Sequence, residues 1–354
     1  MNFLDEMIEI TENPYATIVE EGIAAGDIKG YISTGSLCLN ALLGGSLFSG
    51  LINNKITVFA GETSVGKTYI ALDIVKHFLE DHPTGSVLYF ESESAVSKDM
   101  LVERNIDTKR VGIFPVSTVQ EFRLQVIKII DKYLTIKEKD RPPILLVLDS
   151  LGMLSTTKEM EDTASGKETQ DMTRAKLIKS LFRTITLKMG MAGVPLIITN
   201  HTYDEQGLFP KKIMGGGQGT ALASSTTVFL SKRKDKEGTD VVGNFITCKL
   251  QKGRNTKENS TCEIYLHYKK GMHKYHGLLD LGTKHDVIKK VGNKYDLGMG
   301  DGKMYFEKAI MRDPEKFFTE ELLLKLDEAA RKEFCYGTDT KDTSEEDFNE
   351  TPDE

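Results

Sequence analysis

The sequence predicts an α/β fold with a mainly parallel central sheet. Short runs of aliphatic and β-branched residues recur along the chain, and such continuous runs are typical of strands buried on both faces of a parallel sheet. Longer amphipathic segments near 67–80, 118–134 and 174–190 separate them, as expected for helices that connect parallel strands. The runs are ITVFA (56–60), VLYF (87–90), ILLVL (144–148), PLIIT (195–199) and TTVFL (226–230).

Other segments depart from this alternation. FITCKL (245–250) and TCEIYLHY (261–268) have no helical pattern between them, which predicts an antiparallel pair at one sheet edge. Residues 1–30 predict a short helix and a connecting arm. Residues 283–335 predict a small mixed domain.

Length and composition restrict the class of protein. The 354 residues suffice for one large domain, with room for a small satellite. No apolar run reaches the ~18 residues of a membrane span, and the N-terminus lacks the basic start of a signal peptide. The cysteines form neither a CxxC motif nor a ligand spacing with histidine, which indicates reduced thiols in a cytoplasmic protein. They are Cys38, Cys248, Cys262 and Cys335.

The net charge of −7 is concentrated at the carboxyl end. Residues 339–354 carry eight acidic side chains and one lysine, so this stretch alone has a charge of −7 and the rest of the chain is near neutral. A neutral body permits nucleic-acid binding through local basic clusters. The composition predicts a disordered acidic tail over 336–354. It leaves open whether the tail serves solubility or competes with DNA for a basic surface.

A phosphate-binding loop follows the first strong strand. The sequence GETSVGKT has the pattern G-x-x-x-x-G-K-[ST] between a strand and a helix. Glycines let the backbone curl until its N–H groups face phosphate oxygens, and the helix N-terminus adds a positive dipole end. The lysine is expected to reach the β- and γ-phosphates, and the final threonine to ligate Mg²⁺. The nucleotide-binding residues are Gly61, Glu62, Thr63, Ser64, Val65, Gly66, Lys67 and Thr68.

Carboxylates follow two other strands. Asp149 ends ILLVLD, where it can hold Mg²⁺ through water beside the phosphate loop, together with Thr68. Glu91 and Glu93 lie just past VLYF and share one side if the chain is extended. A carboxylate there can deprotonate the attacking water. We predict Glu93 as the base and Glu91 as its support; the alternative is a solvated acidic turn.

These motifs resemble the RecA family of recombinases over roughly residues 30–282. ISTGSLCLNALLGG (32–45) precedes the first core strand as in that family, and SLGMLS follows Asp149. The resemblance implies a RecA-like P-loop ATPase core over 31–282, a short N-terminal oligomerisation arm over 1–30 and a small C-terminal α/β domain over 283–335. The branch found in T-even-type bacteriophages is most similar, through DMTRAKLIKSLFR (171–183), TNHTY (199–203), MGGGQG (214–219) and YHGLLD (275–280).

The resemblance also implies roles around a bound nucleotide. His201 corresponds to the family's sensor of the γ-phosphate, and a histidine can donate a hydrogen bond there; the residues alone also allow a capping or packed histidine. Lys252 and Arg254 in KLQKGRNTKE resemble cations that reach the ATP of a neighbouring subunit. Met100 stands where the family often stacks an aromatic ring on adenine. Tyr275 is expected to contact the nucleotide.

Two segments are expected to bind DNA. By the resemblance, one DNA-binding loop spans about 157–172 and the other spans about 202–218, after the fourth core strand. Cations neutralise DNA phosphates, apolar side chains stack on or wedge between bases, and glycines let a loop reorder. The candidate residues are Arg174, Lys176, Phe209, Lys211, Lys212, Met214, Gly215, Gly216 and Gly217.

The expected function is that of an ATP-dependent DNA recombinase, which forms a helical filament on single-stranded DNA and exchanges strands with duplex DNA. The expected cofactors are ATP and Mg²⁺. A single-strand-binding protein and a loading mediator are implied partners, and no membrane partner is expected. A ring-type DNA motor usually has an extra N-terminal domain, and only 30 residues precede residue 31. An accessory protein that uses ATP only as a structural ligand would not need Lys67, Glu93 and Asp149 together.

Overall fold

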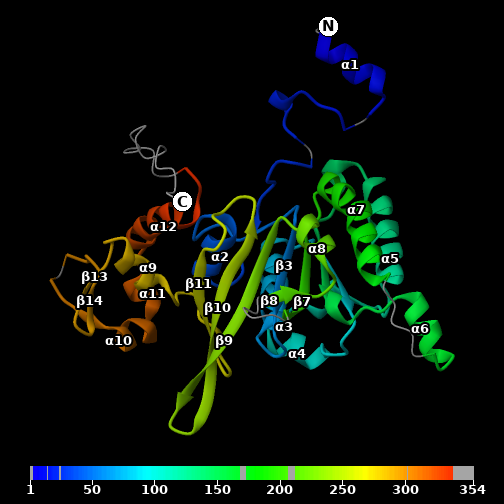
Figure 1. The fold of residues 1–354 in the computed structure, drawn as a ribbon. Helices are drawn as coiled ribbons and strands as arrows, with labels where there is room; N and C mark the ends of the chain where they lie inside the picture. Colours follow the sequence, from blue (N-terminus) through cyan, green and yellow to red (C-terminus); the bar gives the residue numbers. More distant parts are fainter. Residues whose placement is uncertain are drawn as a thin grey trace, which may run out of the picture.

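The computed structural model describes residues 3–13, 15–23, 25–167, 173–205, 212–300 and 302–337. Among these residues, ten strands form one large sheet whose middle is parallel (Figure 1). The strand order in the parallel part is β9-β3-β7-β6-β4-β5. These strands are β3 (Ile56–Gly61), β4 (Ser86–Glu91), β5 (Val111–Pro115), β6 (Ile144–Asp149), β7 (Leu196–Asp204) and β9 (Thr226–Glu237).

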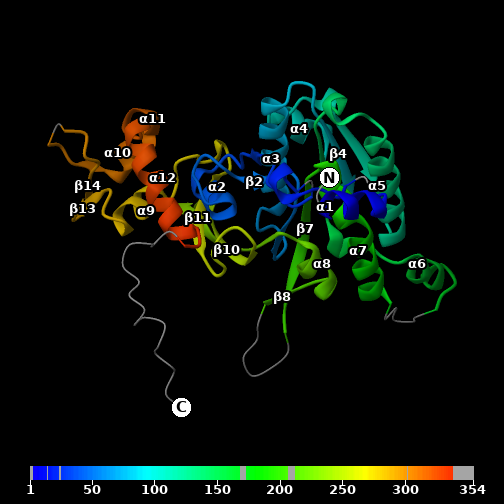
Figure 2. The same cartoon turned by 90° about the horizontal axis from the view of Figure 1, so that it is seen from above.

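Helices cover both faces of the parallel strands (Figures 1 and 2). Successive side chains of β6 point to opposite faces: Leu145 and Val147 join one apolar cluster, whereas Leu146 and Leu148 join the other. This explains why the strands are apolar throughout. The first cluster includes side chains from α2 (Leu37–Gly44) and α3 (Lys67–Asp81), and the second includes those of α5 (Val119–Leu134) and α7 (Arg174–Ala192). The predicted parallel sheet and its helical connections are confirmed.

An antiparallel extension continues the sheet beyond β9. It consists of β10 (Asp240–Gly253), β11 (Thr261–His267) and β12 (Gly271–Met272). The predicted pairing of FITCKL with TCEIYLHY is confirmed, since β10 pairs with β11. The sequence did not reveal how far β9 extends: β9 and β10 form a long hairpin whose turn projects beyond the other strands (Figure 1).

The carboxyl-terminal region packs on α2 and shares its apolar cluster with the core. The Asp327 carboxylate accepts hydrogen bonds from the Ser46 hydroxyl at 2.6 Å and from the Leu47 N–H at 2.7 Å. These buried contacts fix the region against the end of α2. Its elements are α9 (Leu278–Lys284), β13 (Lys289–Val291), β14 (Lys294–Asp296), β15 (Tyr305–Phe306), α10 (Glu307–Arg312), α11 (Pro314–Phe317) and α12 (Glu320–Phe334).

The amino-terminal helix α1 (Phe3–Thr11) lies away from the sheet (Figure 1). Its apolar residues are exposed, with Phe3 at 71% and Ile10 at 72%, so no described part of the chain buries them. Residues 25–27 are attached to the core, because Lys55 donates to the carbonyls of Ala25 and Gly26 and Asn54 donates to that of Asp27. No helix in the described ranges is long and apolar enough to span a membrane. The other short elements are β1 (Tyr31–Ile32), β2 (Leu51–Ile52), α4 (Lys98–Glu103) and α6 (Thr157–Ala164).

Candidate nucleotide and DNA-binding site

The phosphate loop lies at the carboxyl ends of the parallel strands, between β3 and α3. Its two glycines are required by close packing. A Cβ at Gly61 would lie 2.8 Å from the Leu230 carbonyl oxygen, and Gly66 has a φ of +110° with the Ile246 side chain beside it. Val65 is buried, whereas Glu62, Thr63 and Ser64 form the exposed tip of the loop. The loop therefore presents its tip at the end of the sheet where ligands of α/β proteins usually bind.

Lys67 is folded back onto its own loop. Its ammonium donates to the carbonyl oxygens of Gly61 at 3.0 Å and Glu62 at 2.9 Å. Burial lowers the pKa of Lys67, and the nearby Glu93 and Asp149 carboxylates oppose that shift. A bound phosphate group would compete with these two carbonyls for the ammonium.

Asp149 is almost fully buried, with 1% of its surface exposed. Its carboxylate accepts hydrogen bonds from the hydroxyls of Thr68 at 2.8 Å and Tyr89 at 2.7 Å, and from that of Thr199. Burial, followed by the Asp149 charge, raises the pKa of Tyr89 well above its ordinary value, so Tyr89 remains a donor. The oxygen atoms of Thr68 and Asp149 fit Mg²⁺, a hard cation that prefers oxygen ligands and retains waters. Tyr89 and Thr199, which we did not predict, orient the carboxylate.

The carboxylates of Glu91 and Glu93 have different partners. Glu91 accepts hydrogen bonds from the backbone N–H groups of Glu93 (3.2 Å), Ser94 (2.8 Å) and Ala95 (2.7 Å), so it holds the turn after β4. Glu93 instead accepts from the Ser150 hydroxyl and lies 3.1 Å from His201 Nε2. Glu91 thus supports the backbone, and Glu93 lies near Lys67 and His201, whereas the role of Glu93 as the base stays a prediction.

His201 belongs to a strand that continues into a β-hairpin. β7 extends past His201 to Asp204 and pairs with β8 (Lys212–Met214), in the register Thr202 to Met214. The Gly215 N–H donates to the His201 carbonyl at 3.0 Å, and the Asn200 side chain donates to the Gly215 carbonyl at 2.8 Å. The prediction of one irregular loop over 202–218 is therefore wrong at its ends, where strands and the start of α8 (Gln218–Ala223) form. Its middle, 206–211, lies outside the described residues.

The predicted DNA-binding residues differ in their accessibility. Lys176 is exposed, and Lys212 forms an ion pair with Glu62 of the phosphate loop. Met214 packs against the apolar cluster beneath α7, so its side chain is not free to insert between DNA bases. Gly215 and Gly216 are half-buried at the hairpin stem and Gly217 is exposed, which leaves their predicted DNA contact untested. Phe209 and Lys211 lie outside the described residues.

Arg174 does not fit its predicted role in binding DNA. Its guanidinium donates to the carbonyls of Leu151 (3.1 Å), Gly152 (2.8 Å) and Leu154 (2.8 Å) and so is occupied by the turn after Asp149. The predicted loop over 157–172 also begins as a helix, α6, because Thr156 and Glu159 form a capping box. Residues 168–172 lie outside the described residues.

The structure adds candidates that the sequence analysis missed. Tyr203 and Ile213 pair directly across the hairpin stem and are 55% and 45% exposed, so they offer an apolar face on the β7–β8 hairpin, two residues beyond His201 along β7. Lys232 on β9 donates to the Ser64 carbonyl of the phosphate loop. The period of two along β7, with Thr199, His201 and Tyr203 on one face, could have identified Tyr203.

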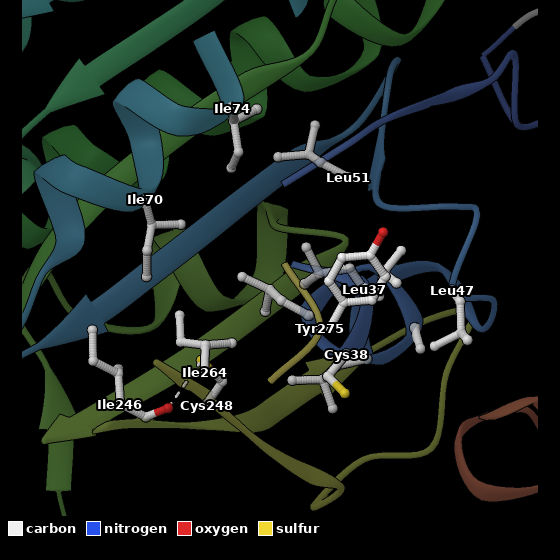
Figure 3. Close-up of a cluster of buried hydrophobic side chains, with 14 of the residues drawn as sticks. Leu37, Cys38, Leu47, Leu51, Ile70, Ile74, Ile246, Cys248, Ile264 and Tyr275 are labelled. Atoms are coloured by element: carbon white, nitrogen blue, oxygen red, sulfur yellow. Dashed lines mark hydrogen bonds between the residues drawn. The ribbon is translucent and has the colours of Figure 1, made fainter. Parts of the chain in front are cut away.

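The predicted nucleotide contact of Tyr275 is wrong. Its ring is 7% exposed and stacks on Phe318 at 5.3 Å between ring centroids. Figure 3 shows it among the buried side chains near Leu37 and Cys38. Met100 is half-buried in α4, and the neighbouring Arg104 guanidinium lies 4.6 Å from the Tyr69 ring centroid. Tyr69 and Arg104 are thus further candidates, beside Met100, for contact with the adenine base.

The two predicted interface cations lie in different surroundings. The Lys252 side chain is half-buried and its ammonium donates to backbone carbonyls at the carboxyl end of α8, whereas Arg254 is exposed. Neither position tests a contact with a neighbouring subunit, so that role stays a prediction.

Comparisons with known proteins agree with this geometry. The model of the RecA N-terminal domain family matches residues 16–273. The chain is 31% identical over 265 residues to the recombination and repair protein of Enterobacteria phage T4, a match that covers 75% of this chain and 66% of the phage protein. It is 25% identical to Protein RecA of Paenarthrobacter aurescens over 303 residues, covering 83% and 82% of the two chains. For Protein RecA of Rhodococcus opacus the identity is 27% over 293 residues, covering 80% and 79%.

The family model covers most of the chain, and the matched residues include the phosphate loop, Glu93, Asp149, His201 and Arg254. The resemblance that the motifs indicated is therefore confirmed: this chain belongs to the RecA family.

Proposed function

We propose that this chain is an ATP-hydrolysing DNA recombinase, which forms a filament on single-stranded DNA and pairs it with homologous duplex DNA. The main support is the contact between Glu93 and His201, because the strand that carries His201 continues into the β7–β8 hairpin. A site suited to phosphoryl transfer and a candidate DNA-binding element thus share one strand. The names of the T4 and RecA relatives agree with this function.

The described residues supply the parts that ATP hydrolysis requires. The N–H groups of the phosphate loop and the start of α3 would bind the phosphates, and Lys67 would leave its carbonyl partners for them. Glu93 would take a proton from the attacking water. If the His201 ring turns to donate to the γ-phosphate, it leaves the Glu93 carboxylate free to act as that base. Mg²⁺, held by Thr68 and through water by Asp149, would neutralise phosphate charge.

Assembly of several copies would provide a covering surface for α1 and a cation for the ATP of the neighbouring subunit. The exposed apolar face of α1 needs a covering surface, and a second copy of the chain is the proposed partner. Arg254 is exposed and would reach the ATP of the neighbouring subunit, where a cation stabilises the transferring phosphoryl group. The proposed division of the chain is an oligomerisation arm over 1–30, an ATPase core over 31–282, a small domain over 283–335 and an acidic tail. A single-strand-binding protein and a loading mediator remain proposed partners, and the cytoplasm the proposed location.

DNA would bind at the hairpin stem and at the segment near Lys176. Tyr203 and Ile213 offer an apolar face for bases, and Lys212 offers a cation for phosphate once it leaves Glu62. Because these contacts would involve the DNA backbone and the faces of the bases rather than their edges, we expect little preference for DNA sequence.

The test is ATP hydrolysis with and without single-stranded DNA, over a range of protein concentrations. We expect strong stimulation by DNA and a steep dependence on protein concentration, and Lys67→Ala should lose turnover. ATP turnover that DNA does not stimulate would contradict the recombinase function. The remaining interpretation would be an ATPase of the same family. Negative-stain images provide the second test, because closed rings instead of open helical filaments would favour a DNA motor.

A further inference from the structure

The Asp149 carboxylate is held by hydroxyl groups from both strands that flank it. β6, which carries Asp149, lies between β4 and β7. From β4 the Tyr89 hydroxyl donates to Oδ2 at 2.7 Å, and from β7 the Thr199 hydroxyl donates to Oδ1. Both side chains are completely buried, with 0% of their surface exposed. We call Tyr89 and Thr199 the hydroxyl clamp.

The alternation of side chains along the strands brings the clamp to the same face of the sheet as the phosphate loop. Val147 and Ile197 belong to the apolar cluster on the α3 side. Side chains two positions further along a strand lie on the same face, so Asp149 and Thr199 face α3 as well. From the first turn of α3, the Thr68 hydroxyl donates to Asp149 Oδ2 at 2.8 Å. The clamp and the phosphate loop therefore meet at one carboxylate.

The clamp limits how this carboxylate can bind a cation. A carboxylate offers about four acceptor positions, shared equally by its oxygens. Tyr89 and Thr68 occupy those of Oδ2, and Thr199 occupies one on Oδ1. The remaining position suits a hydrogen bond from a cation-bound water. Bidentate coordination of a cation would need a free position on both oxygens, and the fixed donors also prevent the carboxylate from turning.

Magnesium and calcium place different demands on such a carboxylate. Mg²⁺ gives up its waters reluctantly and is often held through them. Ca²⁺ takes a larger and more flexible set of oxygen ligands, and carboxylates often coordinate it directly through one oxygen or both. A clamped Asp149 is therefore compatible with Mg²⁺ and unfavourable for Ca²⁺.

We propose that Tyr89 and Thr199 are positioning residues that restrict Asp149 to water-mediated binding of the cation and thereby make the nucleotide site prefer Mg²⁺ to Ca²⁺. This inference rests on the proposed function, because it concerns the cation that accompanies ATP. It gives two residues of the buried sheet a part in selecting that cation. The simpler alternative is that the two hydroxyls only satisfy a buried carboxylate.

The affinity of a non-hydrolysable ATP analogue, measured by calorimetry once with Mg²⁺ and once with Ca²⁺, tests the proposal. We expect Tyr89→Phe and Thr199→Val to lower the ratio of the Mg²⁺ affinity to the Ca²⁺ affinity about three- to tenfold, because Ca²⁺ can then contact Asp149 directly. Thr199→Ser keeps the hydroxyl and should keep the ratio of the unmodified protein. Tyr133→Phe on α5 is the matched control, since the Tyr133 hydroxyl donates to the Pro142 carbonyl at 2.8 Å instead.

Mn²⁺ gives a second measurement, because it accepts the same oxygen ligands and is paramagnetic. Its resonance in water enriched in ¹⁷O reports how many waters it retains beside the analogue. We expect Tyr89→Phe to retain about one water fewer than the unmodified protein, since an Asp149 oxygen replaces it. An unchanged affinity ratio or an unchanged number of waters would overturn the proposal, even if the variant is less stable.

The thermodynamic test remains decisive in two further situations. If Tyr89→Phe does not fold, Thr199→Val and Thr199→Ser decide the proposal by the same measurements and with the same overturning results. If DNA does not stimulate ATP turnover of the unmodified protein, the recombinase function fails, but the affinity ratio still decides whether the hydroxyl clamp selects the cation.

Discussion

At the scale of single residues, Glu91 and Glu93 show how carboxylates two positions apart acquire different hydrogen-bond partners. Glu91 ends β4 and Glu93 follows it, and Ser94 adopts a positive φ of 54° that turns the chain back toward Glu91. The Glu91 carboxylate is thereby surrounded by backbone N–H groups, and Glu93 reaches Ser150 and His201 across the site. Residue type alone could not separate them, because the separation arises from the turn.

Substitution of each glutamate by glutamine separates stability from catalysis. We expect Glu93→Gln to reduce DNA-stimulated ATP hydrolysis at least ~100-fold while ATP binding and thermal stability persist, because an amide cannot accept the water proton. Glu91→Gln should lower the free energy of unfolding by about 1–3 kcal/mol, because the turn loses a charged acceptor. Steady-state hydrolysis and thermal unfolding measure these effects. A Glu91→Gln protein that is fully stable yet inactive would show that Glu91 takes part in the chemistry.

Asp73 on α3 predicts a pH dependence of stability. Burial raises its pKa from 3.8 to about 6, although His77, Lys76 and Arg104 act in the opposite direction and Glu80 adds to the increase. The folded state thus favours the protonated carboxyl. That stabilisation is complete below the unfolded pKa and is lost as the pH rises through about 6.

Asp73→Asn should remove this pH dependence. Relative to the unmodified protein, the variant should gain about 2–3 kcal/mol of unfolding free energy between pH ~4 and pH ~7. Denaturant unfolding at several pH values measures the difference, and Asp81→Asn at the exposed end of α3 is the control. A difference that stays constant over this range would mean that the Asp73 carboxyl titrates normally in the folded state.

At the scale of secondary structure, the predictions succeeded where one local pattern decides the element. The apolar runs gave β3, β4, β6, β7 and β9 because both faces of the parallel sheet are covered. The predictions failed where tertiary contacts decide the position of a side chain. The ring of Tyr275 is buried against Phe318, and the Arg174 guanidinium donates to carbonyls after Asp149. The capping box at Thr156 and Glu159 was visible in the sequence and should have indicated α6.

The ion pair between Glu62 and Lys212 connects the phosphate loop to the hairpin stem. Hydrogen bonding to Glu62 raises the pKa of Lys212, so the lysine stays charged. If the stem binds DNA as proposed, DNA phosphate would have to compete with Glu62 for this cation. Glu62 would then weaken that contact before nucleotide binds.

Glu62→Gln should release Lys212. We expect single-stranded DNA binding without nucleotide to strengthen about two- to fivefold at low salt, and the gain to shrink as salt is added. Glu103→Gln on α4 changes the net charge equally, lies on another exposed surface and is the control. Fluorescence anisotropy with labelled DNA gives the affinities. An equal gain in both variants would attribute the effect to net charge alone.

At the scale of the whole molecule, α1 lies outside the packed structure. None of its residues is buried, so it contributes little to the stability of the monomer. Our proposal that α1 associates with another copy of the chain would account for its exposed apolar face.

Deletion of residues 1–13 tests that explanation. The melting temperature should stay within about 2 °C of that of the full chain, because no core contact is lost. Half-maximal DNA-stimulated ATP turnover should require at least ~10-fold more protein, because the filament loses an interface. Size-exclusion chromatography should show smaller assemblies. If the activity curve is unchanged over protein concentration, subunits are joined by another surface.

The order of strands in the sheet affects synthesis of the chain. β7 lies between β3 and β6, although it follows both in the sequence. Asp149 therefore lacks Thr199 until the ribosome has added 50 further residues, which takes roughly 3–10 s at typical elongation rates. Glu93 waits longer, because His201 follows it by 108 residues. During this interval the nascent chain exposes the unpaired edges of β3 and β6, which are open to aggregation and to chaperones. Chains that stall before residue 196 contain the entire phosphate loop but lack the Thr199 and His201 side chains of the proposed ATP site.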